Sequence, residues 1–341
     1  MSQPGTDPWA IAEADFPASG TAAERLTFLL GYAVLAPSTH NSQPWRFRLR
    51  GDRLELVADR TRALAVSDPE DRELTLSCGC ALYQLRVAIR RFGFRGEVTT
   101  WPDPTDPDLF ARIGLGEPGE ATAEELAEFG AIPRRRTHRG AFDARSVAAD
   151  VLTELRLLAT EEGAWLHLVE TPAERAALAD LINEADARQG SDPSFRRELA
   201  AWLHPSRRES GDGIPDHALG VDDLKFYRGP LVVRTFDRGD GEAARDRQVT
   251  DGSPVLAVLG TDHDTPPAWL KAGQALGRLL LRARSLGLFS SYLNQPVEVP
   301  EVRGKLPDVL GRDGKPQLVL RFGYAAEPAP SPRRPVESVL G

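Results

Sequence analysis

Apolar residues recur at helical spacing in two long segments of the first third of the chain. Residues 21–36 place their leucines on one face, and Thr21 precedes Glu24 at the spacing of a capping box. Pro37 cannot continue that helix, so we expect it to end there. Residues 68–93 repeat the apolar spacing over a longer run, which predicts a second, largely buried helix.

The second helix is predicted to begin near Pro69 and to stop at Gly93. Its apolar face would consist of Leu74, Cys78, Ala81, Leu82, Leu85 and Ile89. Between the two helices, residues 45–49 and 53–59 alternate in period two on either side of a Gly-Asp pair, which predicts a β-hairpin.

The second half of the chain carries the same two kinds of pattern. Helical spacing predicts helices over 146–161, 172–189 and 266–286, and short apolar runs predict strands over 164–170, 253–260 and 317–323. The fold class is therefore α+β, with helices packed on a mostly antiparallel sheet or pair of sheets.

Two long helical segments also resemble each other. When 78–94 is laid over 272–288 without a gap, six of seventeen positions are identical, including Gly79 with Gly273. Two helices rich in Leu, Ala and Arg can match by chance. The alternative is a fused dimer, in which two related halves pack through equivalent long helices.

Composition narrows the functional classes. The 341 residues are 41% hydrophobic with a net charge of -8, which favours a globular protein and argues against a nucleic-acid backbone as partner. No apolar run could span a bilayer, and the first residues lack the pattern of a signal peptide, so we expect no membrane partner and a cytoplasmic location. Cys78 and Cys80 are interpreted as packing residues, and the histidines lack zinc-ligand spacing, so no metal site is expected.

Two polar stretches remain to be explained, "APSTHNSQPWRF" from residue 36 and "PRRRTHRGAF" over 133–142. The first resembles the flavin loop of the nitroreductase family, and the second resembles the arginine-rich turn with which that family binds the FMN phosphate. Here their order is reversed and they lie about a hundred residues apart, which, with "SPRRPVESVL" near the end, is similar to the Acg branch. The resemblance implies a nitroreductase-like α+β fold in which halves 1–125 and 126–341 imitate the family homodimer.

The same resemblance implies where FMN would bind. Arg135, Arg136, Thr137 and Arg139, in the turn 133–140 at the start of a helix, would hold the phosphate, joined by Arg333 and Arg334 from the tail. The alternatives are a solvated basic turn and a disordered Pro-rich tail.

The flavin loop, 36–45, would supply short polar groups to the isoalloxazine or ribityl chain. Its candidate residues are Ser38, Thr39, Asn41 and Gln43; the alternative is that they only end a helix and form a turn. A second segment, aligned with the family stretch over flavin N5, contributes Tyr292, Leu293, Asn294 and Gln295.

Residues 203–220 form a long polar stretch that is interpreted either as a lid over the flavin or as a surface insertion. In the first case Trp202, His204, Arg207 and Arg208 would line its inner side.

The implied activity is FMN-dependent oxidation of NADPH or NADH with ping-pong hydride transfer through flavin N5 to a small-molecule acceptor, a nitroaromatic or a quinone. The cofactor carries the chemistry, so no catalytic side chain is assigned. The alternative is a protein that sequesters FMN or responds to stress, with little turnover because a lid occludes the site. A further alternative function is that of a flavin-dependent dehydrogenase acting on a peptide-derived substrate. The chain would be a monomer with an internal pseudo-dimer, able to dimerise further.

Overall fold

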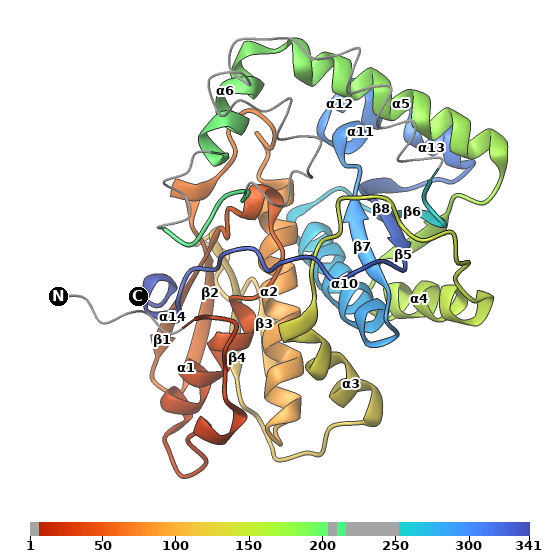
Figure 1. The fold of residues 1–341 in the computed structure, drawn as a ribbon. Helices are drawn as coiled ribbons and strands as arrows, with labels where there is room; N and C mark the ends of the chain where they lie inside the picture. The colour runs from red at the N-terminus through yellow and green to blue at the C-terminus, as the bar shows by residue number, and fades with distance from the viewer. Residues whose placement is uncertain (1–6, 204–209, 216–251) are drawn as a thin grey trace.

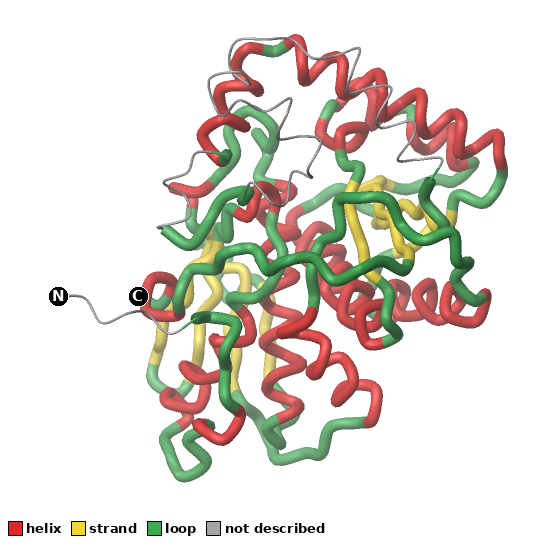
Figure 2. The backbone as a smooth tube through the Cα atoms, viewed as in Figure 1, coloured by secondary structure: helices red, strands yellow, loops and turns green. Residues whose placement is uncertain are grey.

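The computed structural model describes residues 7–203, 210–215 and 252–341, which form two four-stranded antiparallel sheets among helices (Figures 1 and 2). The strands of the first sheet, in the order β1-β2-β4-β3, are β1 Trp45–Arg50, β2 Arg53–Ala58, β3 Glu97–Thr100 and β4 Leu109–Gly114. Those of the second, in the order β5-β6-β8-β7, are β5 Trp165–Leu168, β6 Val255–Thr261, β7 Phe289–Tyr292 and β8 Lys315–Gly323. Both sheets follow the order first-second-fourth-third, and the predicted α+β class is confirmed.

The helices repeat this arrangement. A helix precedes the first strand of each sheet, and a long helix connects the second strand to the third (Figure 1). The main helices are α1 Ala22–Ala33, α2 Arg72–Arg91, α3 Ala123–Ala131, α4 Ala149–Glu161, α5 Pro172–Ser191, α6 Pro193–Trp202 and α10 Pro266–Ser285. Shorter ones are α11 Gln295–Glu298, α12 Pro300–Arg303, α13 Leu306–Leu310 and α14 Val336–Val339. In the described ranges, no helix is both long and apolar enough to cross a membrane.

Local sequence signals explain most of these boundaries. The capping box at the start of α1 is present, with the Glu24 amide donating to Thr21 Oγ1 and Thr21 donating to the Glu24 carboxylate. Pro69 was predicted near the first turn of this helix, and it lies just before α2, which begins at Arg72. The Asp68 carboxylate accepts from the amides of Glu73 and Leu74, which places the helix start after the proline.

The centre of the molecule is the crossing of α2 and α10. A Cβ on Gly79 would lie 2.5 Å from the carbonyl oxygen of Leu270, and one on Gly273 would overlap the carbonyl oxygen of Leu76. The sequence repeat pairs Gly79 with Gly273 and Leu76 with Leu270, so the contacts are reciprocal, as in a two-fold interface. Of the two interpretations of the repeat, the crossing supports related halves rather than chance similarity.

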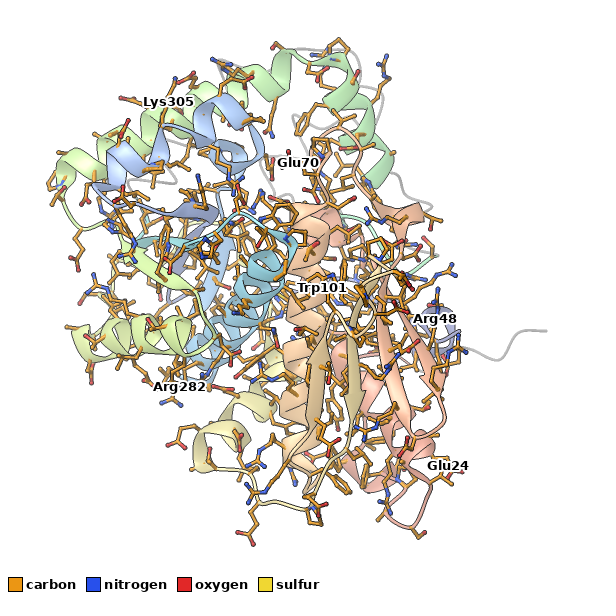
Figure 3. All side chains as sticks on the ribbon, turned by 180° about the vertical axis from the view of Figure 1, so that it is seen from behind. Glu24, Arg48, Glu70, Trp101, Arg282 and Lys305 are labelled. Atoms are coloured by element: carbon orange, nitrogen blue, oxygen red, sulfur yellow. The ribbon has the colours of Figure 1, made fainter. Side chains whose placement is uncertain are left out.

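The tail joins the two halves. After β8 the chain crosses the molecule and ends in α14 beside β1, where Leu340 forms a bridge with Phe47 (Figure 1). The exposed charges of Glu24 and Lys305 lie at opposite ends of the molecule, far from the crossing (Figure 3). Both halves contribute to one hydrophobic core, which runs from Leu26 and Trp45 to Leu320 and Phe322.

Candidate functional site

A cavity of about 390 Å³ lies where the two halves meet. Its walls come from the loop after α1, the arginine turn, the segment after β7, the tail and the helices α5 and α6. Twelve of the fourteen predicted site residues line it: Ser38, Thr39, Asn41, Arg135, Arg136, Thr137, Arg139, Tyr292, Leu293, Asn294, Gln295 and Arg333. Gln43 and Arg334 do not.

One end of the cavity is cationic. Arg135 and Arg333 are only 3% and 6% exposed, Arg136 is half-buried, and Arg139 is exposed while lining the cavity. Among the described residues, Nε and one terminal nitrogen of Arg135 have no hydrogen-bond partner, nor do the Nε atoms of Arg136 and Arg333. Four guanidinium groups therefore lie close together, and several of their N–H donors have no hydrogen-bond partner among the described residues.

Burial of this cluster disfavours its charge. Desolvation lowers the pKa of Arg135, and desolvation together with the neighbouring guanidiniums lowers the pKa of Arg333 well below its usual value. Desolvation lowers the pKa of Arg136 to about 10. Buried cations without counter-charges destabilise a protein, and a bound anion with several acceptor oxygens would relieve that cost. The cationic end could therefore hold an anion with several acceptor oxygens.

The arginine turn does not stand at the start of a helix, so that part of the prediction is wrong. Thr137 forms a parallel bridge with Ser290 of β7, and the His138 amide donates to the Ser290 carbonyl at 2.9 Å. Pairing with the edge of β7 keeps the chain out of helical conformation, and α4 begins only at Ala149. The guanidiniums alone, without a helix dipole, make this end positive.

The loop after α1 has a strained backbone. His40, Asn41 and Gln43 have φ values of 51°, 55° and 51°, a left-handed conformation that residues other than glycine seldom adopt. The Ser38 hydroxyl accepts from the Gln43 amide at 2.9 Å, and the Thr39 hydroxyl donates to Glu73 at 2.7 Å. Burial lowers the pKa of His40 to about 4, so this imidazole is neutral at pH 7.

The amide side chains of the loop fasten it to other segments. Asn41 Nδ2 donates to the carbonyls of Gly213 and Pro332, and its Oδ1 accepts from Arg333 at 2.8 Å. Gln43 Nε2 donates to the Gly211 carbonyl at 2.9 Å, and its Oε1 accepts from the Arg334 amide. These two side chains use their donors and acceptors within the protein, so they shape the loop; Asn41 lines the cavity, and Gln43 does not.

The tail has a defined position against the flavin loop, which argues against a disordered tail, while the phosphate role of its arginines stays a prediction. Arg333 lines the cavity. Arg334 does not, and its guanidinium donates to the carbonyls of Gln43 and Ser338. The Arg334 guanidinium also lies 3.8 Å from the carboxylate of Asp59. The two adjacent arginines therefore have different surroundings. Arg333 lines the cavity, and Arg334 attaches the tail to the residues just before β1 and just after β2.

The segment after β7 forms the wall opposite the loop. The Tyr292 hydroxyl is buried and has no partner in the part of the chain that the structure describes. Leu293 is 5% exposed, and Asn294 Oδ1 accepts from the Val319 amide at 3.1 Å. The hydroxyl of Tyr292, the last residue of β7, is thus a polar group at the cavity that could bind a ligand.

Two carboxylates, Glu73 and Glu298, also line the cavity, and neither was among the residues predicted for the site. Glu73, in the first turn of α2, is 2% exposed and is bonded to Thr39 and Arg72. Glu298 of α11 accepts from Gln189 of α5 at 2.6 Å, and burial together with the Glu73 carboxylate raises the pKa of Glu298 to about 8. The position of Glu73 could have been noticed in the sequence, because it is a charged residue in a helix predicted to be largely buried. Trp9 and the residues from α5 and α6 had none.

The described part of the predicted lid lies against the flavin loop. Ile214 lines the cavity, and Asp212, 1% exposed, forms an ion pair with Arg62. Trp202 is buried under the Arg62 guanidinium but is not part of the cavity wall. His204, Arg207, Arg208 and residues 216–220 lie outside the described residues.

Within the described residues, no group of three histidine, cysteine, aspartate or glutamate side chains is placed to hold a metal ion. The thiols of Cys78 and Cys80 are buried and donate to the carbonyls of Pro44 and Gly273. Burial raises the pKa of Cys80 to about 12, so its thiol stays protonated although it lines the cavity.

Comparison with known proteins gives relatives over nearly the whole length, although no family model matches the chain. A Mycobacterium tuberculosis protein with the provisional name NAD(P)H nitroreductase Rv3131 is 34% identical over 324 residues, 93% of this chain and 91% of its own. The Acg protein of the same species, also provisionally named an NAD(P)H nitroreductase, is 31% identical over 316 residues, 90% of this chain and 92% of its own.

The solved structures that resemble the chain are shorter. The FMN- and NADPH-dependent nitroreductase NfnB from a Sphingopyxis strain superposes with a TM-score of 0.41 at 19% identity, covering 63% of this chain and 97% of its own. A Bacteroides fragilis nitroreductase with bound FMN gives a TM-score of 0.37 at 19% identity, covering 59% and 90%.

Proposed function

Because the chain belongs to the nitroreductase family, in the branch that includes Acg, we propose that it binds FMN in the cavity between its halves. The observation that carries the proposal is the cluster of buried guanidiniums with unused donors, which a phosphate would satisfy. Arg135, Arg136, Thr137, Arg139 and Arg333 would hold this phosphate. The cavity volume of about 390 Å³ is within the range of small-molecule sites.

The rest of the cavity would hold the flavin ring. Loop residues Ser38 and Thr39 would lie along one side, and Tyr292 to Gln295 along the other. Bound FMN would supply hydride chemistry, and the protein would orient the ring and keep water from it. Asn41, Gln43 and Arg334 would act indirectly, by holding the loop and the tail in place.

The proposed reaction is an NAD(P)H-dependent reduction of a small-molecule acceptor, a nitroaromatic or a quinone. Electron donor and acceptor would use the same cavity in turn, as a ping-pong scheme requires. No side chain has to act as a general base, and His40, neutral and buried, is poorly suited to be one.

One observation favours the second candidate, a protein that sequesters FMN. The stretch 210–215 borders the cavity through Ile214 and is fastened to the flavin loop by the Asn41 and Gln43 amides. A segment held in this way would restrict access to the face on which a nicotinamide ring must stack.

Flavin titration followed by anaerobic reduction tests the proposal. We expect the purified protein to bind FMN and the oxidised flavin spectrum to bleach on addition of NADPH or NADH. Persistence of the oxidised spectrum with both donors would favour sequestration. Failure to bind FMN would contradict both candidates.

Three further expectations stay predictions. They are the boundary between halves 1–125 and 126–341, the cytoplasmic location, and the pairing of the pseudo-dimer into a larger assembly. The acceptor would be identified by testing nitroaromatics and quinones against the reduced protein.

A further inference from the structure

The N-terminal segment reaches the cationic end of the cavity through a single aromatic side chain. Trp9 lines the cavity, and its indole Nε1 donates to the carbonyl of Ser331 in the tail at 2.9 Å. This hydrogen bond joins positions 322 residues apart in the chain. The two ends of the chain therefore meet at the place where the guanidiniums gather.

The Trp9 ring lies against two of these guanidiniums. The central carbon of the Arg136 guanidinium is 3.9 Å from the ring centroid, and that of Arg333 is 5.1 Å from it. Both distances are in the range of cation–π attraction, which is strongest for tryptophan and increases when the cation is desolvated. Within the described residues, neither Arg136 nor Arg333 forms an ion pair with a carboxylate; besides the ring, their neighbours of opposite polarity include neutral oxygens, such as Asn41 Oδ1 beside Arg333 and the Arg135 carbonyl beside Arg136.

An aromatic ring suits this place better than an acidic residue would. A carboxylate would neutralise the guanidiniums and compete with an incoming anion for their donors. The face of an indole stabilises the cations and covers them from water without accepting their N–H groups, and the Nε donors of both arginines remain without a partner among the described residues. Holding two long side chains in position also reduces the entropy lost when a ligand binds.

We propose that Trp9 is a binding residue of the anion end, which holds Arg136 and Arg333 in position so that the protein distinguishes a phosphorylated flavin from an unphosphorylated one. The inference rests on the proposed FMN site and adds to it a residue from outside the arginine turn, the flavin loop and the tail. It also makes the N-terminal segment part of the cofactor site.

The test compares FMN with riboflavin, which lacks the phosphate, in wild-type protein and in Trp9→Leu. We expect the substitution to weaken FMN binding about tenfold, equivalent to about 1.4 kcal/mol, and to leave riboflavin binding unchanged. Trp9→Phe retains an aromatic face but loses the hydrogen bond to Ser331, and it should stay within about threefold of wild type for FMN. Trp101→Leu, which removes a tryptophan packed on Phe110 outside the cavity wall, should change neither affinity.

The outcomes separate the inference from the proposed function. Wild-type protein that does not bind FMN would overturn the FMN site itself. Wild-type binding with equal FMN affinity in Trp9→Leu, or an equal loss for FMN and riboflavin, would overturn only the role of Trp9. If Trp9→Leu does not fold, Trp9→Phe decides: an FMN loss as large as tenfold with riboflavin unaffected would show that the hydrogen bond, not the ring, positions the arginines.

Discussion

At the scale of single residues, two neighbouring arginines show how surroundings decide a role. Arg333 has an unused Nε donor at the cavity, whereas Arg334 is bonded to the carbonyls of Gln43 and Ser338 and lies beside Asp59. Arg135 resembles Arg333, since it is 3% exposed with two unused nitrogens. A buried cation that has no counter-charge until a ligand binds lowers the stability of the ligand-free protein.

Arg135→Met should therefore have opposite effects on stability and on binding. Without FMN, we expect the variant to gain about 1 kcal/mol in the free energy of unfolding, because an uncompensated charge is removed. Its FMN affinity should fall about a hundredfold, because a charge-assisted hydrogen bond to phosphate is lost. Thermal unfolding with and without FMN measures both. The control Arg334→Met should lose stability instead, and a less stable Arg135→Met without FMN would contradict the prediction.

A second residue-scale prediction concerns Glu298. Burial and the carboxylates of Glu73 and Asp68 raise its pKa to about 8, against the attraction of Arg72 and the hydrogen bond from Gln189. A raised pKa means that the folded protein holds this proton more tightly than the unfolded chain, so the stabilisation is full at low pH and is lost as pH rises toward 8. Glu298→Gln cannot ionise, and its stability relative to wild type should increase from about pH 5 to about pH 9.

Unfolding of both proteins by urea across that pH range measures the difference. We expect the variant to gain at least about 1 kcal/mol on wild type between the two ends of the range. The control is Glu70→Gln at an exposed position, which should show no such trend. A constant difference between Glu298→Gln and wild type would refute the assignment.

The sequence predicted the cationic residues better than the acidic ones. Arg135 to Arg139 and Arg333 belong to short contiguous motifs, and such motifs are visible without any knowledge of the fold. Glu298, Gln189 and Trp9 reach the cavity from separate elements, and only the packing of α5, α11 and the N-terminal segment brings them there. The resemblance identified fourteen residues, and it could not tell that Gln43 and Arg334 bond to each other instead of lining the cavity.

At the scale of elements, the long helices were predicted well and the short strands poorly. α2 and α10 have apolar periodicity over 20 residues each, enough for the pattern to stand out. α5 is equally long, but its apolar residues are not gathered on one face; the capping box of Thr171 and Glu174 and the proline in its first turn mark its start. β3, with its sequence EVTT, has no buried position, and β7 has four residues. Because β7 was not predicted, its pairing with Thr137 was not either, and the arginine turn was wrongly placed at a helix start.

The crossing of α2 and α10 yields an element-scale prediction. Gly79→Ala would bring a methyl group to 2.5 Å from the Leu270 carbonyl oxygen and 2.8 Å from Gly273 Cα, and both are backbone atoms that cannot turn aside. We expect a loss of about 1–3 kcal/mol in the free energy of unfolding, because the helices must separate. The control is Gly130→Ala in α3, where the nearest atom is 3.9 Å away on the flexible Arg134 side chain. There, the higher helix propensity of alanine should leave stability unchanged or raise it by up to about 1 kcal/mol. Equal effects of the two substitutions, measured by urea unfolding, would contradict the prediction.

At the scale of the whole molecule, the two halves share a topology but differ at the position of the site. The loop after α1 borders the cavity beside Cys80 of α2, and the repeat pairs Cys80 with Gln274 of α10. At that second position Gln274 accepts from Arg86 at 2.9 Å, and Arg86 also donates to Glu162 at 2.7 Å in the turn after α4. A network of charged side chains occupies the place where the first half has a cavity.

This asymmetry predicts one FMN for each chain, although the pseudo-dimer contains two related halves. The molar ratio of FMN, from its absorbance, to protein should be close to one after removal of free FMN by gel filtration. The cavity between the halves has guanidinium donors without partners, whereas the bonded side chains of Arg86, Glu162 and Gln274 occupy the pseudo-equivalent position. Arg135→Met should reduce the ratio, since it removes a predicted phosphate donor. Glu162→Gln, at the pseudo-equivalent position, should leave it unchanged, since that position binds no flavin. Two FMN per chain, or a ratio that falls with Glu162→Gln as it does with Arg135→Met, would mean that the second half keeps a site of its own.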